Sequence, residues 1–189
     1  MNIIDRIIEL DIKKTFRGSD GGRSFEKYAK ILRNFKGINV ETNRSFQKDF
    51  NGFYRVRRNP EWQKGYYAIM EKGKTQTLSF EQALYGIYNL TGRVEASFAS
   101  KMIHTLNNDM PIWDKFVVQN LGLKMPICQG EKKIQESIFL YQKIINWYEK
   151  VLSTVEINKK IEEFDEIFPE YKWFSKTKKI DFLLWRIRD

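Results

Sequence analysis

Residues 79–106, SFEQALYGIYNLTGRVEASFASKMIHTL, contain two helical patterns separated by one short break, and they decide the fold class. Ser79 and Gln82 match a capping box, in which two side chains satisfy free amides of a starting helix. Apolar residues then recur at helical spacing in two stripes. The first stripe comprises Phe80, Ala83, Leu84 and Ile87, and the second Ala96, Ala99, Ile103 and Leu106. Leu90–Val94 forms the connection between them.

Helical spacing also extends through the other long segments, whereas strand signals are weak. We expect helices over residues 24–36, 44–58, 60–73 and 131–154, and another ending the chain. Ser24 is the expected cap of the first of these, with Gly37 closing it. The preceding run Gly18–Ser24 is typical of a flexible loop. The chain is therefore predicted to be all-α, with residues 1–189 forming a single helical domain.

The composition supports a sizeable core and excludes several classes of site. Hydrophobic residues make up 42% of the 189 residues and aromatics 15%. Apolar runs are shorter than the roughly 18 residues of a membrane span, so we expect no membrane partner and a cytoplasmic protein. The single Cys128 excludes cysteine-ligated zinc or iron–sulfur sites, and the single His104 excludes two-histidine metal motifs. The sequence contains neither a Walker-type phosphate loop nor a Gly-x-Gly-x-x-Gly motif, so no cofactor and no metal site is predicted.

The net charge of +9 is unevenly distributed. Residues 44–74 contain eight basic and three acidic side chains, whereas residues 75–130 contain four of each. The surplus centres on Arg55, Arg57 and Arg58, of which at least two must be exposed if the segment is helical. A basic excess of this kind suits a nucleic-acid footprint or an ordinary solvated face, and the sequence leaves both open.

The stretch from Leu90 to Val117, LTGRVEASFASKMIHTLNNDMPIWDKFV, resembles the helix–hairpin–helix DNA glycosylases of the endonuclease III, adenine glycosylase and 8-oxoguanine glycosylase group. In that family a Leu-Pro-Gly-x-Gly hairpin opens a helix, and a catalytic aspartate follows about twenty residues later. Aligned without gaps, Leu90 and Gly92 match the hairpin, and Asp114 matches the aspartate. The resemblance implies a two-lobed helical fold, DNA binding by Gly92 and Arg93, and base excision by Asp114.

Several positions differ from the family pattern. Thr91 replaces the hairpin proline and Val94 its second glycine, which reduces the backbone's access to a phosphate. The Schiff-base lysine position of bifunctional members holds Glu95 or Ala96. Lys101 lies five residues beyond Ala96, about 140° round the helix, and is the weaker catalytic candidate. The resemblance therefore implies monofunctional base excision, which leaves the DNA strand uncut.

Physical chemistry supplies an independent reason to consider Asp114. A carboxylate at a helix start stays ionised beside free amides, and it could stabilise the positive charge that develops on a sugar during base excision. A plain N-cap is the alternative. Ser97, Lys101 and His104 share one helical face, which could line a site beside Asp114 or face solvent. His104 alone is expected at the surface, and Trp113 is the tryptophan best placed to line a pocket and contact a base.

Two other functions stay open at this point. The chain could be a non-catalytic nucleic-acid-binding or assembly module that has kept the fold, or a helical protein-interaction domain. DNA is the expected partner, and the sequence sets neither the substrate base nor the oligomeric state.

Overall fold

The computed structural model describes residues 2–17 and 19–187. Across these ranges the regular elements are α-helices with one short 3₁₀ helix, and no strand occurs. The predicted all-α class is therefore confirmed. The helices in the first half of the chain are α1 (Ile3–Ile8), α2 (Ile12–Thr15), α3 (Ser19–Phe35), α4 (Arg44–Tyr54), α5 (Pro60–Lys72) and α6 (Phe80–Thr91). Those in the second half are α7 (Ala96–Leu106), α8 (Lys115–Asn120), α9 (Gly130–Leu152), α10 (Val155–Ile167), η1 (Pro169–Tyr171) and α11 (Lys176–Arg186).

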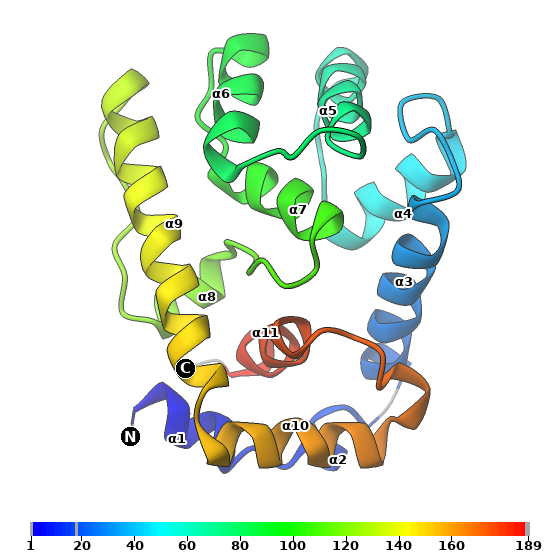
Figure 1. The fold of residues 1–189 in the computed structure, drawn as a ribbon, viewed down its shortest axis with the longest axis vertical. Helices are drawn as coiled ribbons and strands as arrows, with labels where there is room; N and C mark the ends of the chain where they lie inside the picture. The colour runs from blue at the N-terminus through cyan, green and yellow to red at the C-terminus, as the bar shows by residue number, and fades with distance from the viewer. Residues whose placement is uncertain (1, 18, 188–189) are drawn as a thin grey trace.

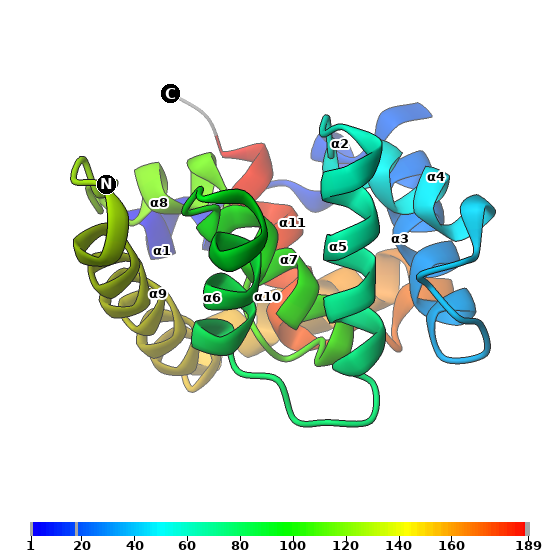
Figure 2. The same cartoon turned by 90° about the horizontal axis from the view of Figure 1, so that it is seen from above.

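The helices form an upper and a lower group in Figure 1. Helices α5, α6 and α7 pack in succession in the upper part, while α10 contacts α1, α2 and α11 in the lower part. Helices α3 and α9 run along the two sides and connect the groups. Figure 2 shows that α8 lies on the side opposite the loop between α5 and α6. The molecule therefore has two distinct faces across which sites can be placed.

One hydrophobic cluster extends from Ile7 to Ile187 and includes residues of both groups. Aromatic side chains dominate its lower part, where the Phe25 ring lies 4.7 Å from Phe182 and 5.3 Å from Phe164. Edge-to-face contacts of this kind add to the free energy gained by burying the rings. A shared core of this size holds α3, α10 and α11 together.

Local signals fixed several helix starts as predicted. Ser79 and Gln82 form both hydrogen bonds of the capping box at the start of α6. Asn59 caps α5, and Pro60 occupies its first position, where the missing N–H has no helical partner to lose. The Asp114 side chain caps α8. These three confirmed starts frame the segment in which the candidate site lies.

Two helix boundaries differ from the sequence-based expectation. Residues 19–24 are helical and belong to α3, so the predicted loop and the Ser24 cap are wrong; Gly18 lies outside the described residues. A glycine costs a helix only about 1 kcal/mol, and the turn that buries Phe25 propagates backward through Gly22. Helix α4 ends at Tyr54 rather than at residue 58.

The end of α4 is set by Arg55, whose φ of 55° places it in the left-handed region. The Val56 N–H donates to the Asn51 carbonyl, and the Val56 side chain is buried, which gives a Schellman-type stop. Among the described residues Arg55 alone combines a side chain with a positive φ. Glycine is the usual residue for this role, so the local sequence did not indicate the stop.

Candidate active site

Asp114 lies at the junction between an extended segment and α8. Its Oδ1 accepts a hydrogen bond from the Phe116 N–H at 2.8 Å, and the side chain is half-buried. The preceding segment is fixed to the core, because the Trp113 N–H donates to Ser100 Oγ and the Tyr141 hydroxyl donates to the Pro111 carbonyl. The carboxylate is thus held on a rigid support at a helix start, where ionisation is favoured.

The Lys101 side chain lies half-buried on α7. Its Nζ donates to the Tyr54 carbonyl at 3.3 Å and lies 5.0 Å from the centre of the Phe98 ring. Burial lowers the pKa of Lys101, and the negative charge of Asp114 is the strongest influence opposing that shift. The two residues predicted as catalytic therefore influence each other electrostatically. A lysine with a lowered pKa is a better nucleophile near neutral pH.

A buried ion pair from α11 completes this polar centre. Lys178 Nζ lies 2.6 Å from Asp181 Oδ2, and both side chains are more than nine-tenths buried. The same ammonium lies over the rings of Phe182 and Tyr28, at 4.4 and 4.8 Å. Burial raises the pKa of Asp181, whereas Lys178 lowers it. Asp181 also stabilises the charged form of Lys101, so the pair belongs to the same electrostatic cluster.

His104, three residues after Lys101 on α7, is fully buried, so the expectation of a surface histidine is wrong. Its Nδ1 faces the Met110 carbonyl at 2.7 Å, and a carbonyl only accepts. Nδ1 therefore has the hydrogen, and Nε2 accepts from the Tyr28 hydroxyl at 2.7 Å. Burial, together with the positive charge of Lys178, lowers the pKa of His104 to about 3. His104 is a neutral structural link between α3, α7 and the following loop.

The neutral state of His104 makes the stability of the fold depend on pH. An unfolded histidine takes up a proton below about pH 6.5, whereas the folded one resists protonation down to about pH 3. We expect the free energy of unfolding to fall with pH by about 1.4 kcal/mol per unit across this window. His104→Gln should lack that contribution, and denaturant titrations of both proteins between pH 6.5 and 4 measure the difference. Equal slopes would show that the imidazole is protonated in the folded state.

The three arginines predicted to contact nucleic acid fall into two groups. Arg55 and Arg57 are exposed. The guanidinium carbon of Arg55 lies 6.0 Å from the centre of the Trp185 ring, beside Lys101. Arg58 instead pairs with Glu95, whose side chain is nine-tenths buried, with Nη2 and Oε1 at 2.5 Å. Arg55 and Arg57 are therefore the two of the three that are exposed to solvent, and the charge of Arg55 acts on Lys101.

The hairpin-like turn is exposed at Gly92 and Arg93. Gly92 ends α6 with a φ of 65°, the left-handed conformation that explains a glycine at this position. The Arg93 N–H donates to Thr91 Oγ1 at 3.1 Å and is therefore already used as a donor. Thr91 stands where the helix–hairpin–helix glycosylases have a proline, and its hydroxyl accepts from an amide that could otherwise donate to a phosphate.

No family model, curated protein or solved structure matches this chain. Its function therefore has to be argued from the site itself. Within residues 2–17 and 19–187, no cluster of three or more His, Cys, Asp or Glu side chains could hold a metal ion. None of the helices in the same ranges has the length and apolar character needed to cross a membrane.

The Trp113 side chain is 1% exposed and belongs to the core. Its ring stacks parallel to Phe80 with centroids 6.5 Å apart. It does line a small pocket, as its sequence position suggested, but this pocket does not include Asp114. A contact between Trp113 and a stacked base stays a prediction and would require the ring to be uncovered.

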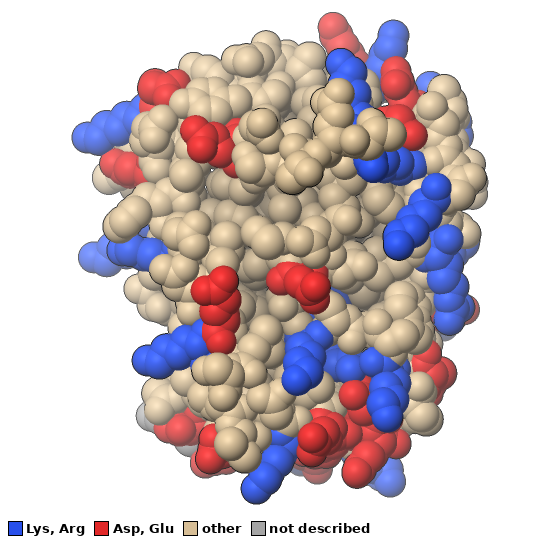
Figure 3. Space-filling view, viewed as in Figure 1, with Lys and Arg blue, Asp and Glu red and all other residues tan. Residues whose placement is uncertain are grey.

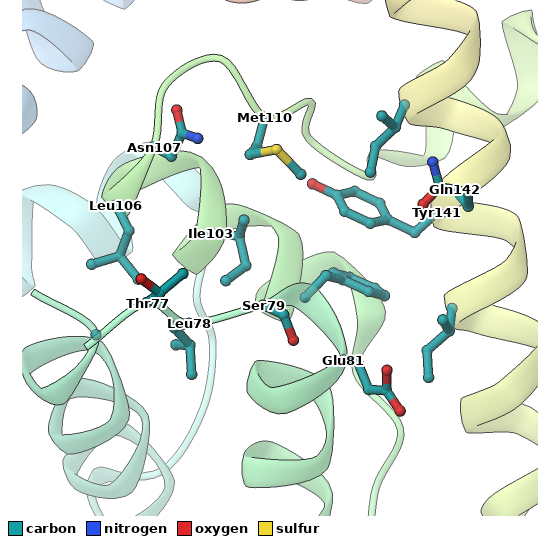
Figure 4. A pocket seen from close by; sticks show the side chains of 14 residues that line it. Thr77, Leu78, Ser79, Glu81, Ile103, Leu106, Asn107, Met110, Tyr141 and Gln142 are labelled. Carbon is teal, nitrogen blue, oxygen red and sulfur yellow. The ribbon is translucent and has the colours of Figure 1, made fainter.

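An apolar pocket lies on the other face of the molecule. Figure 3 shows this face with a hollow near its middle, formed mainly by uncharged residues. The pocket has a volume of about 550 Å³ and lies between the start of α6, the end of α7 and α9. In Figure 4 Leu106, Ile103 and Met110 lie along one side of it and Tyr141 along the other. Neither Asp114 nor Lys101 lines this pocket.

The Lys178–Asp181 pair and the Arg58–Glu95 pair were missed by sequence reasoning. Lys178 and Asp181 have the three-residue spacing of a helical ion pair, but the same spacing occurs on solvated helices. Arg58 and Glu95 are 37 residues apart and give no local signal. In each case burial distinguishes the pair, and burial depends on how the helices pack.

Proposed function

We propose that the chain binds DNA and excises a base from it, with Asp114 as the reacting carboxylate. The observation that supports this most is the electrostatic influence of the Asp114 carboxylate on Lys101, a half-buried amine whose pKa is lowered by burial. A carboxylate and such an amine on rigid supports suit a reaction that develops positive charge on a sugar. Arg55 and Arg57 are both exposed, and exposed arginines of this kind could bind the flanking phosphates.

In the proposed step the bond between the sugar C1′ and the base nitrogen breaks. The base leaves with the electron pair, and C1′ becomes an oxocarbenium ion next to the Asp114 carboxylate. Water then adds to C1′ and loses a proton to the carboxylate or to solvent, leaving an abasic site. The strand itself stays intact in this hydrolytic version.

The neighbouring amine favours a second version of the same reaction. If neutral Lys101 attacks C1′ instead of water, the base leaves with its electron pair and Nζ loses a proton. The C1′–O4′ bond then opens to give an imine, and elimination of the 3′ phosphate can cut the strand. Borohydride reduces such an imine and links protein to DNA covalently. The hydrolytic reaction should leave abasic strands uncut. If borohydride instead links the wild-type protein to DNA, and Lys101→Gln abolishes that link, the covalent reaction is established.

The experiment that tests the function is a panel of duplexes, each with one damaged or mismatched base. Abasic sites are scored after incubation with the wild-type protein, and DNA binding is measured on the same duplexes. Release of at least one base would support the proposal. Binding without release would favour a non-catalytic nucleic-acid-binding module.

A protein-interaction module is the remaining candidate, and the large apolar pocket beside Tyr141 is the observation that favours it. Small-molecule and peptide sites are commonly concave and apolar. Absence of DNA binding even at low salt would make this the better account.

The salt dependence of binding tests the role of the arginines. If Arg55 and Arg57 each neutralise one phosphate, Arg55→Ala/Arg57→Ala should reduce the slope of log Kd against log salt by about two units. Arg58→Ala is the matched control, since Arg58 is already paired with Glu95. It should change stability more than the slope. Equal slopes for the wild type and the double variant would show that Arg55 and Arg57 do not contact phosphates.

A further inference from the structure

A second pocket lies where the segment after α6 meets α7, α9 and the loop before α9. Its volume is about 280 Å³, close to the lower end of small-molecule pockets. The lining includes Arg58, Glu95, Phe98, Trp113, Met125 and Lys133. It shares none of its residues with the larger apolar pocket on the other face.

Two side chains of this lining each have a buried polar atom without a hydrogen-bond partner. They are Oε2 of Glu95 and Nε1 of Trp113. Arg58 uses only the other carboxylate oxygen, since both its Nε and its Nη2 donate to Oε1. Buried polar groups in folded proteins are nearly always hydrogen-bonded, because an unpaired one loses its hydration for nothing. The two atoms therefore require an explanation.

The unpaired atoms define complementary chemistry. Glu95 Oε2 needs a donor, and the Trp113 indole N–H needs an acceptor. Phe98 and Met125 supply apolar walls, which suit a flat, uncharged body. Arg58 and Lys133 outnumber the one carboxylate of the lining, so a cationic ligand is disfavoured.

We propose that this pocket binds a small cyclic amide or imide of nucleobase size. Both atoms are covered in this structure, so the ligand reaches them only when the side chains over them move. Its N–H then donates to Glu95 Oε2, and its carbonyl oxygen accepts from Trp113 Nε1. The ring contacts Phe98 and Met125. The inference does not rest on base excision, because neither Asp114 nor Lys101 lines the pocket.

The test follows the Trp113 indole signal in ¹⁵N-labelled protein, assigned by its loss in Trp113→Phe. We expect 1-methyluracil, which keeps one ring N–H, to shift this signal at millimolar concentration and to saturate. The matched ligand 1,3-dimethyluracil keeps both carbonyls but has no N–H, so it should bind at least about tenfold more weakly. Both ligands are compared on the wild-type protein, so the outcome does not depend on a variant that folds.

Glu95→Gln provides the second measurement. The amide keeps the shape and can still accept from Arg58, but its NH₂ faces the ligand donor, so binding should weaken about tenfold. An unmoved Trp113 signal, equal binding of the two uracils, or unchanged binding by Glu95→Gln would overturn the proposal. A free base and a base in a strand present the same edge. Comparing 1-methyluracil with a short single-stranded oligonucleotide containing uracil shows which is bound more tightly.

Discussion

Asp114→Asn should lose most base-release activity, by about 100-fold or more, while the protein stays folded and still binds DNA. The substitution removes the negative charge that would stabilise the oxocarbenium ion and leaves the size of the side chain unchanged. Asparagine is about as good an N-cap as aspartate, so the hydrogen bond to Phe116 can be kept at a cost well under about 1 kcal/mol. Activity, unfolding and DNA binding are measured side by side.

Asp11 offers a matched control for this substitution. Its Oδ1 caps α2 by accepting from the Lys14 N–H at 2.8 Å, which is the same structural role. Asp11→Asn should therefore change neither base release nor stability by a large amount. If Asp114→Asn behaves like Asp11→Asn in an active protein, Asp114 is only a cap and the reacting group lies elsewhere. If the wild type releases no base at all, the non-catalytic module becomes the better account.

The parts of the fold that could be predicted from sequence are those set by neighbouring residues. The capping box of Ser79 and Gln82 satisfies amides within one turn, so four residues are enough to place the start of α6. Pro60 and Asp114 mark helix starts for similarly local reasons. The apolar stripes indicate helices because each residue's neighbours in the sequence are also its neighbours on the helix surface.

Boundaries that depend on tertiary packing were not predictable in this way. Gly18–Ser24 has the composition of a loop, yet residues 19–24 extend α3 because the following turns are anchored in the core. Arg55 adopts a left-handed conformation with no glycine to announce it. Intrinsic preferences of about 1 kcal/mol are easily outweighed by the burial of one aromatic side chain.

The candidate site shows the same division. The order of turn, helix and aspartate in the sequence predicted Asp114 as a site residue. Lys101 was predicted because it lies on the polar face of the helix that precedes Asp114. The burial of each side chain could not be predicted, because it depends on packing against α11, which lies at the far end of the sequence. Helix α11 supplies Lys178 and Asp181; both charges act on Lys101, and that of Lys178 also acts on His104. A solvated polar face and a partly buried polar cluster share one sequence pattern.

Lys178→Met should destabilise the fold by about 3 to 5 kcal/mol, the usual result of leaving one member of a buried ion pair without its partner. Methionine keeps most of the volume among Tyr28 and Phe182, so little of the loss comes from a cavity. Lys30→Met is the matched control. Lys30 pairs with Asp49 at 2.8 Å on the surface, and breaking an exposed pair costs less than about 1 kcal/mol. Denaturant unfolding measures both.

The pH dependence of the Lys178→Met variant identifies the cause of its loss. Burial raises the pKa of Asp181, and removing Lys178 takes away the main influence that lowers it. An acid whose folded pKa is raised gives its full stability below the unfolded pKa and loses it as the pH rises through the folded pKa. The variant should therefore be less destabilised at pH 4 than at pH 8, and adding Asp181→Asn should recover part of the stability at pH 8. A loss that is equal at both pH values would mean that Lys178 stabilises the fold by packing against the aromatic rings rather than by neutralising Asp181.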